Sequence, residues 1–102
     1  MHQLKPTRVI HIKDAPPGWK TNPDYVFIGR GSKWGNEYSH LAVSRARHQV
    51  SSREEAVDGF ERNQLPGLRQ FLPELRGRIL VCFCHPKACH GHVLAREADK
   101  ER

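Results

Sequence analysis

The chain has 102 residues, of which 37% are hydrophobic, below the roughly 45–50% of an average globular domain. This length predicts a single domain over residues 1–102 with one modest core. The 17 Lys and Arg residues exceed the 11 Asp and Glu residues and give a net charge of +6, which favours an anionic partner. No apolar run approaches the ~18 residues of a membrane span, and the first residues form no apolar leader. We therefore expect a cytoplasmic protein with no membrane partner.

The strongest strand signals are three short apolar segments. Residues 7–12 alternate loosely between apolar and polar side chains, and 25–28 form a continuous run of strand formers typical of a buried strand. Residues 78–84 are apolar on both faces and predict the central strand. The prolines and glycine of 14–24 predict an irregular connection, with Trp19 plugged against the core.

The clearest helix signal is a capping box, in which Ser52 is followed three residues later by Glu55. A second helical segment over 67–72 has its leucines and phenylalanine on one face, and Pro73 is expected to end it. Residues 90–100 predict a closing helix, and the ambiguous stretch 39–49 is compatible with another.

This order of elements predicts a small α/β domain: a short, mostly parallel sheet with flanking helices, a reduced version of a Rossmann-like fold. A helical crossover between the strands at 25–28 and 78–84 makes them parallel. The segments that follow them, 29–36 and 84–89, then leave the same edge of the sheet, where open α/β folds bind their ligands.

The first of these segments, GRGSKWGN at 29–36, has the composition of an anion-binding loop. Its glycines allow close backbone approach, its Arg and Lys supply positive charge, and its Trp offers an aromatic face for stacking. The alternative is a tight surface loop whose Trp packs into the core. With the glycine at the start of the last helix, the candidate ligand-binding residues are Gly29, Arg30, Ser32, Lys33, Trp34, Asn36 and Gly91.

The second segment concentrates three cysteines and three histidines between residues 82 and 92. An odd number of clustered cysteines argues for a reducing compartment, in which thiols act as ligands or reactive groups. Cys89 lies at the expected N-terminus of a helix, which favours thiolates and anions, so Cys89 and the adjacent His90 are candidate catalytic residues. Zinc is the candidate cofactor, and its possible ligands are Cys82, Cys84, Cys89 and His92. The alternative is that these cysteines are core residues and the histidines are surface groups.

Both motifs resemble a known family. The order YVFIGR, GSKWGN, SREEAVDGF and LPELRGRILVCFCHPKACHGHVL is similar to the family called domain of unknown function 4326, which comprises small bacterial and phage proteins. The resemblance implies a functional role for both motifs but assigns no activity. Two positions depart from the family pattern: Glu37 replaces a usual Pro, and His92 replaces a usual acidic residue.

These observations lead to two hypotheses about function. In the first, a phosphate-bearing ligand, either a nucleotide or a nucleic acid, binds between loop 29–36 and the segment 84–92. The protein would then be a binding protein or an enzyme that processes nucleotides or nucleic acid. In the second, the chain is a non-catalytic, zinc-stabilised module that binds nucleic acid or protein. A phage protein that inhibits a host factor in the host cytoplasm would be one example.

Overall fold

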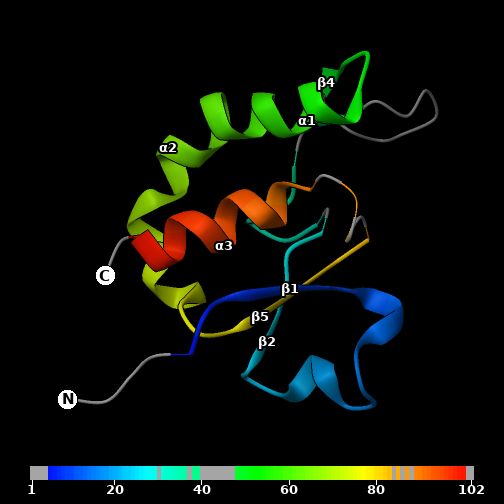
Figure 1. The fold of residues 1–102 in the computed structure, drawn as a ribbon, viewed down its shortest axis with the longest axis vertical. Coiled ribbons are helices and arrows are strands. Elements are labelled where there is room, and N and C mark those ends of the chain that lie inside the picture. The colour runs from blue at the N-terminus through cyan, green and yellow to red at the C-terminus, as the bar shows by residue number, and fades with distance from the viewer. Residues whose placement is uncertain are drawn as a thin grey trace.

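A three-stranded parallel sheet with the strand order β1-β5-β2 forms the base of the fold (Figure 1). Its strands are β1 (Arg8–His11), β2 (Tyr25–Phe27) and β5 (Ile79–Cys82), and β5 pairs in parallel with both of the others. The computed structural model describes residues 5–29, 31–36, 38–39, 48–83, 85, 87 and 89–100. The parallel sheet with its helices confirms the predicted α/β class.

The helices form two groups. The first is a continuous helical arm over residues 53–75, made of α1 (Arg53–Gly59), the π-helical η3 (Phe60–Gln64), α2 (Leu65–Leu68) and the 3₁₀-helical η4 (Arg69–Leu75). The second is α3 (His90–Lys100), which lies between this arm and the sheet (Figure 1). Within the described part of the chain, no helix is long and apolar enough to cross a membrane.

The start of the helical arm confirms the predicted capping signal. The Ser52 side chain accepts a hydrogen bond from the Glu55 backbone N–H at 3.1 Å. The Glu55 carboxylate accepts from the Ser51 backbone N–H at 2.8 Å. In a standard capping box it would accept from the N–H of Ser52, the next residue in the chain. The bond to Ser52 satisfies one of the backbone donors that the first helical turn leaves unpaired, and so marks where the arm begins.

The core lies between the helices and one face of the sheet. The central strand β5 contributes the fully buried Leu80 and Cys82, as the sequence predicted. The expectation of a buried strand at 25–28 is only partly correct, because all three residues of β2 are half-buried and only the next residue, Ile28, is fully buried. The reason is that β2 is an edge strand with a single neighbour in the sheet.

Pro73 does not end the second helical segment, contrary to the sequence-based expectation. It lies inside η4, which continues to Leu75. Leu72 and Leu75 are both fully buried, and the burial of these two side chains stabilises the helical path on either side of the proline. A sequence pattern alone could not weigh this tertiary packing against the missing N–H of proline.

Two connections also differ from expectation. Residues 12–24 contain two single 3₁₀ turns, η1 (Ile12–Asp14) and η2 (Trp19–Thr21), and Trp19 is half-buried against the edge strand rather than plugged into the core. The ambiguous stretch 39–49 begins and ends in two short parallel strands, β3 (Tyr38–Ser39) and β4 (His48–Gln49). Its interior, 40–47, lies outside the described residues.

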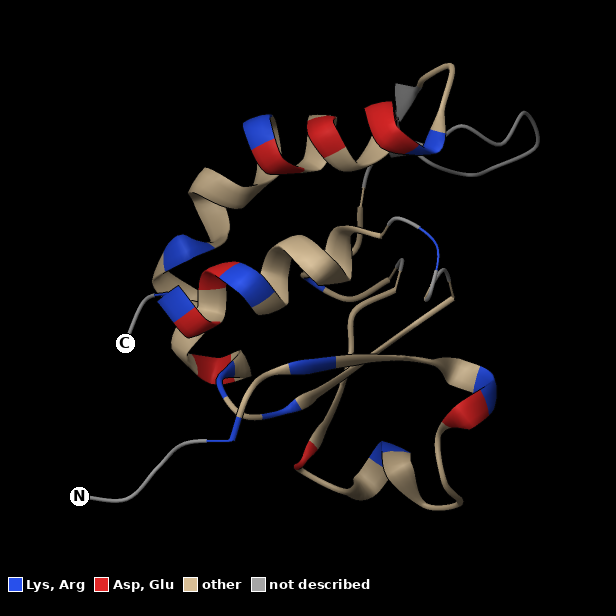
Figure 2. Ribbon diagram, in the orientation of Figure 1, with Lys and Arg blue, Asp and Glu red and all other residues tan. Residues whose placement is uncertain are grey.

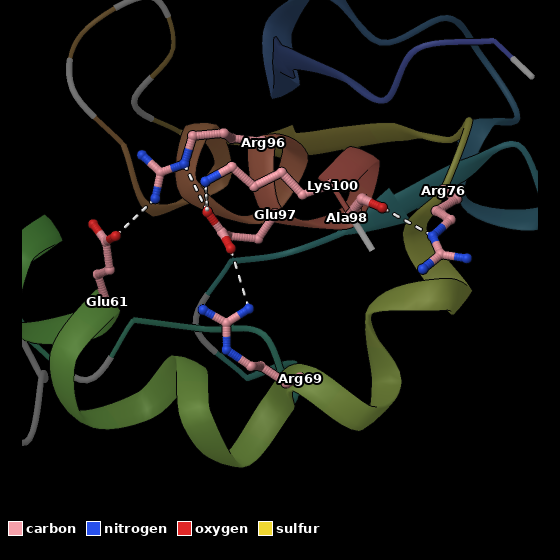
Figure 3. A network of polar contacts seen from close by, with 7 residues as sticks. All are labelled: Glu61, Arg69, Arg76, Arg96, Glu97, Ala98 and Lys100. Carbon is pink, nitrogen blue, oxygen red and sulfur yellow. Dashed lines mark hydrogen bonds and ion pairs between the residues drawn. The ribbon is translucent and has the colours of Figure 1, made fainter. Parts of the chain in front are cut away.

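A buried acidic residue holds α3 against the helical arm (Figure 3). Glu97 is 6% exposed, and its carboxylate accepts from Arg69 of η4 at 3.1 Å and from Arg96 at 2.9 Å. Lys100 lies 3.3 Å from the same carboxylate, and Arg96 also contacts Glu61 of η3 at 2.7 Å. The hydrogen bond from Arg96, followed by those from Arg69 and Lys100, lowers the pKa of Glu97 from its ordinary 4.5 to about 2. The Glu97 carboxylate thus links α3 to η4, and Arg96 extends the network to η3.

Candidate functional site

The two motif-bearing segments leave the sheet at one edge. β2 and β5 are adjacent and parallel, with Phe27 opposite Val81 in the register, so both strands end at the same side of the sheet. Loop 29–36 follows β2, and the segment that leads to α3 follows β5. We call this side the carboxyl edge. Parallel pairing of these strands was predicted from the helical crossover alone, and the structure confirms it.

His90 fastens the start of α3 to the end of β2. Its Nε2 lies 2.7 Å from the backbone carbonyl oxygen of Ile28, the residue directly before loop 29–36. Because a carbonyl only accepts hydrogen bonds, Nε2 is the protonated ring nitrogen. Gly91 packs on the same residue, since a Cβ added to it would lie 2.6 Å from Ile28 Cδ1. The N-terminus of α3 is therefore held against Ile28, the residue from which the loop starts.

Inside loop 29–36, polar side chains hold the loop in shape. The Ser32 hydroxyl donates to the Gly29 carbonyl oxygen at 2.7 Å. The Asn36 amide donates to the Ala56 carbonyl oxygen at 2.9 Å, and Gln64 donates to the Gly35 carbonyl oxygen at 2.9 Å. Both of the latter bonds join the loop to the helical arm. Gly31 has a φ of 103°, a backbone conformation that favours glycine.

Two of the side chains expected to supply charge and stacking already have contacts within the protein. Trp34 is 3% exposed and belongs to the core, so its ring is not presented to a ligand, and the alternative of a core-packed Trp is the correct one. Lys33 forms an ion pair with Glu74 at 2.8 Å, and its Nζ lies 4.3 Å from the centre of the Phe71 ring. Arg30, the other charged candidate, lies outside the described residues.

Cys89 and His90 are in contact directly at the start of α3. Cys89 Sγ accepts from the Gly91 backbone N–H at 3.3 Å and lies 3.8 Å from His90 Nδ1. Since Nε2 of His90 donates to Ile28, its Nδ1 is an acceptor in the neutral ring. A thiol, an imidazole and an orienting carbonyl thus stand in the order that nucleophilic catalysis requires. Both side chains are buried, at 2% and 7% exposure.

The expected zinc ligands do not form one group in the described part of the chain. There, no three His, Cys, Asp or Glu side chains are placed to hold a metal ion. Cys82 Sγ accepts from the His85 backbone N–H at 3.4 Å and lies 3.6 Å from the Ile10 carbonyl oxygen. Cys84 lies outside the described residues. A zinc site therefore stays a prediction.

His92 instead pairs with His85, a contact that the sequence analysis did not anticipate. His85 Nδ1 and His92 Nε2 are 3.0 Å apart, and the two rings meet edge to face. Burial, and then the neighbouring His85, lower the pKa of His92 below its ordinary 6.5. The seven-residue separation crosses from the loop into α3, so no helical periodicity could have indicated this pair.

A row of aromatic rings at the carboxyl edge was also missed. Phe83 follows β5 and is 59% exposed, its ring centre lies 5.9 Å from that of Phe27, and Phe27 in turn lies 6.3 Å from Trp19. Phe27 is opposite Val81 in the sheet, and Phe83 is two residues beyond Val81, so both phenylalanines point to the same face. The sequence predicted the parallel pairing of these strands but not the register that brings the two rings together.

The chain belongs to the family described as Domain of unknown function (DUF4326), whose model matches residues 10–100. This confirms the family resemblance that the two sequence motifs indicated. Among curated proteins, it is similar to an "Uncharacterized 12.4 kDa protein in nrdA-td intergenic region" of Enterobacteria phage T4. The two are 34% identical over 81 residues, which cover 74% of this chain and 68% of the phage protein. No solved structure matches the chain significantly.

Proposed function

We propose that this protein binds a phosphate-bearing ligand, a nucleotide or a nucleic acid, at the carboxyl edge of its sheet. The ligand would lie between loop 29–36 and the N-terminus of α3. The observation that carries the proposal is the contact of 2.7 Å between His90 and the Ile28 carbonyl oxygen, because it brings these two segments together. Open parallel sheets bind ligands at this edge, and a helix N-terminus attracts anions.

Charge supports the same ligand class. The net charge of the chain is +6, and an exposed lysine, Lys87, lies in the segment between β5 and α3 (Figure 2). Arg30 follows Gly29, the first residue of the loop, and a guanidinium can grip a phosphate with two parallel donors. The side chains of Ser32, Lys33 and Asn36 already have partners, so we expect Arg30 and the loop backbone to make the main phosphate contacts.

Cys89 and His90 are the residues that we propose nearest to any chemistry at this site. Their contact would allow a thiol to pass its proton to the imidazole. Because both side chains are buried, binding has the stronger structural support, and catalysis would require some of the surrounding residues to move.

The test compares variants of a single charge. Arg30→Ala should weaken the binding of nucleoside phosphates or short oligonucleotides by about 10- to 100-fold in calorimetric titration, and Arg30→Lys should restore it only in part. The matched control is Arg62→Ala, which removes an exposed arginine on the helical arm that pairs with Asp58. Equal losses of affinity in both variants would mean that net charge, and not a specific contact of Arg30, determines binding. No binding of either ligand by the intact protein would refute the proposal.

Metal content separates this proposal from the zinc-stabilised alternative. If zinc is structural, the purified protein should contain about one metal ion per chain, and a chelator should unfold it. In the phosphate-binding proposal, a metal-free protein stays folded and keeps its affinity for nucleotides. Elemental analysis with a thermal melt in chelator decides between these outcomes.

A further inference from the structure

Phe83 exposes an unusual amount of apolar surface for its position. It is 59% exposed, and among the described residues it is the only large hydrophobic side chain classed as exposed. A single exposed phenylalanine needs no explanation by itself. This one, however, directly follows the central strand at the carboxyl edge, the side of the sheet from which loop 29–36 and the segment leading to α3 also leave.

The ring is held in place by a second phenylalanine. Phe27 meets Phe83 at an interplanar angle of 88°, and the ring centres are 5.9 Å apart, a geometry that aromatic pairs favour. The Phe27 ring also packs against the first residue of loop 29–36, because a Cβ added to Gly29 would lie 2.3 Å from Phe27 Cζ. The exposed ring is therefore coupled through one neighbour to the backbone of loop 29–36.

The row continues away from the loop. Trp19 lies 6.3 Å from Phe27, between ring centres, and Lys20 Nζ lies 6.0 Å from the Trp19 ring. A surface hollow of about 360 Å³, lined by residues 15–21, adjoins this end of the row. Aromatic rings accompanied by a cation, starting at a phosphate site, form the combination by which proteins bind unpaired nucleic acid strands.

We propose that Phe83, supported by Phe27, is a stacking platform for an unpaired base of a single-stranded nucleic acid. This inference rests on the proposed function, since the phosphates of the same strand would occupy the carboxyl edge. A duplex keeps its base faces stacked inside and offers none to Phe83. Phe27 and Trp19 are half-buried, so they support Phe83 and do not themselves offer a face to a base. The net charge of +6 favours a polyanion over an apolar protein segment.

The experiment measures the affinity for a labelled single strand of about 12 nucleotides by fluorescence anisotropy at low salt. Phe83→Ala and Phe83→Leu should each lose about 5- to 150-fold in affinity, because neither side chain can stack on a base. Phe83→Trp should keep or raise the affinity. Because the side chain is largely exposed, these variants should fold, which circular dichroism verifies. Full affinity in Phe83→Leu would overturn the proposal, since a merely apolar contact would then suffice.

An abasic strand separates failure of this inference from failure of the proposed function. It has the same phosphates and no bases, so the intact protein should bind it about as weakly as Phe83→Ala binds the normal strand. Equal binding of both strands by the intact protein would overturn the stacking platform and leave the phosphate site standing. No binding of either strand would overturn the platform. Calorimetric titration with mononucleotides would then show whether the phosphate site also fails.

Discussion

Replacing Glu97 by glutamine removes the charge at the centre of the network in Figure 3 and keeps the shape of the side chain. A pKa lowered from 4.5 to about 2 corresponds to at most about 3 kcal/mol of stability at neutral pH. The side chains of Arg69, Arg96 and Lys100 are 46%, 48% and 66% exposed, so solvent screens part of this energy. We therefore expect Glu97→Gln to lose about 1–2 kcal/mol, which lowers the melting temperature by about 4–15 °C.

The pH dependence of this loss makes the test specific. Because the pKa of Glu97 is lower in the folded state, its contribution is complete above about pH 5 and disappears as the pH falls toward 2. Urea unfolding followed by circular dichroism should thus show a difference between wild type and Glu97→Gln that shrinks with acid. The control Glu61→Gln, at the exposed end of the network, should change stability by less than about 0.5 kcal/mol. A difference that is absent at pH 7, or that persists unchanged at pH 2–3, would refute the reasoning.

Two further predictions concern the carboxyl edge. Gly29→Ala should lower the free energy of unfolding by about 1–3 kcal/mol because its Cβ would lie 2.3 Å from Phe27 Cζ. The control Gly67→Ala meets no atom within 4 Å and should gain up to about 1 kcal/mol, so equal effects in urea would contradict the close approach. His92 should titrate below its ordinary 6.5 in NMR, because burial and then His85 lower its pKa. The unfolded chain then binds this proton at higher pH, so stability falls as the pH drops below about 6.5, and a His92 that titrates at or above 6.5 would contradict the burial.

The sequence predicted the parts of the fold that depend on local pattern. The apolar run at 78–84 marked the central strand, and the pattern over 90–100 marked α3, in which Val93, Leu94 and Ala98 are buried. The sequence-based predictions failed where the structure of a segment depends on the elements packed against it. Whether β2 is central or at an edge depends on which strands lie beside it, and whether Pro73 ends a helix depends on how tightly Leu72 and Leu75 pack.

The candidate site was likewise predictable only in part from the sequence. Its position at one sheet edge followed from the crossover rule, which depends only on the order of elements. The roles of its side chains did not, because they are set by residues far along the chain. Asn36 bonds to Ala56 and Lys33 pairs with Glu74, and no local motif contains these partners. A loop rich in polar groups has the sequence pattern of a binding site even when those groups form hydrogen bonds within the protein that stabilise the loop.

This use of side chains constrains how the site could work. The Ser32 hydroxyl, the Asn36 amide and the Lys33 amine are already engaged within the protein, so a ligand would not have to order these side chains. The contacts that we propose for a ligand are the loop backbone and Arg30 for its phosphates and the exposed ring of Phe83 for a base. Phosphates recognised through backbone and one guanidinium, together with a base recognised through stacking, give an affinity that depends weakly on base identity. Binding constants for strands of different sequence should therefore differ far less than those for stacked and abasic strands.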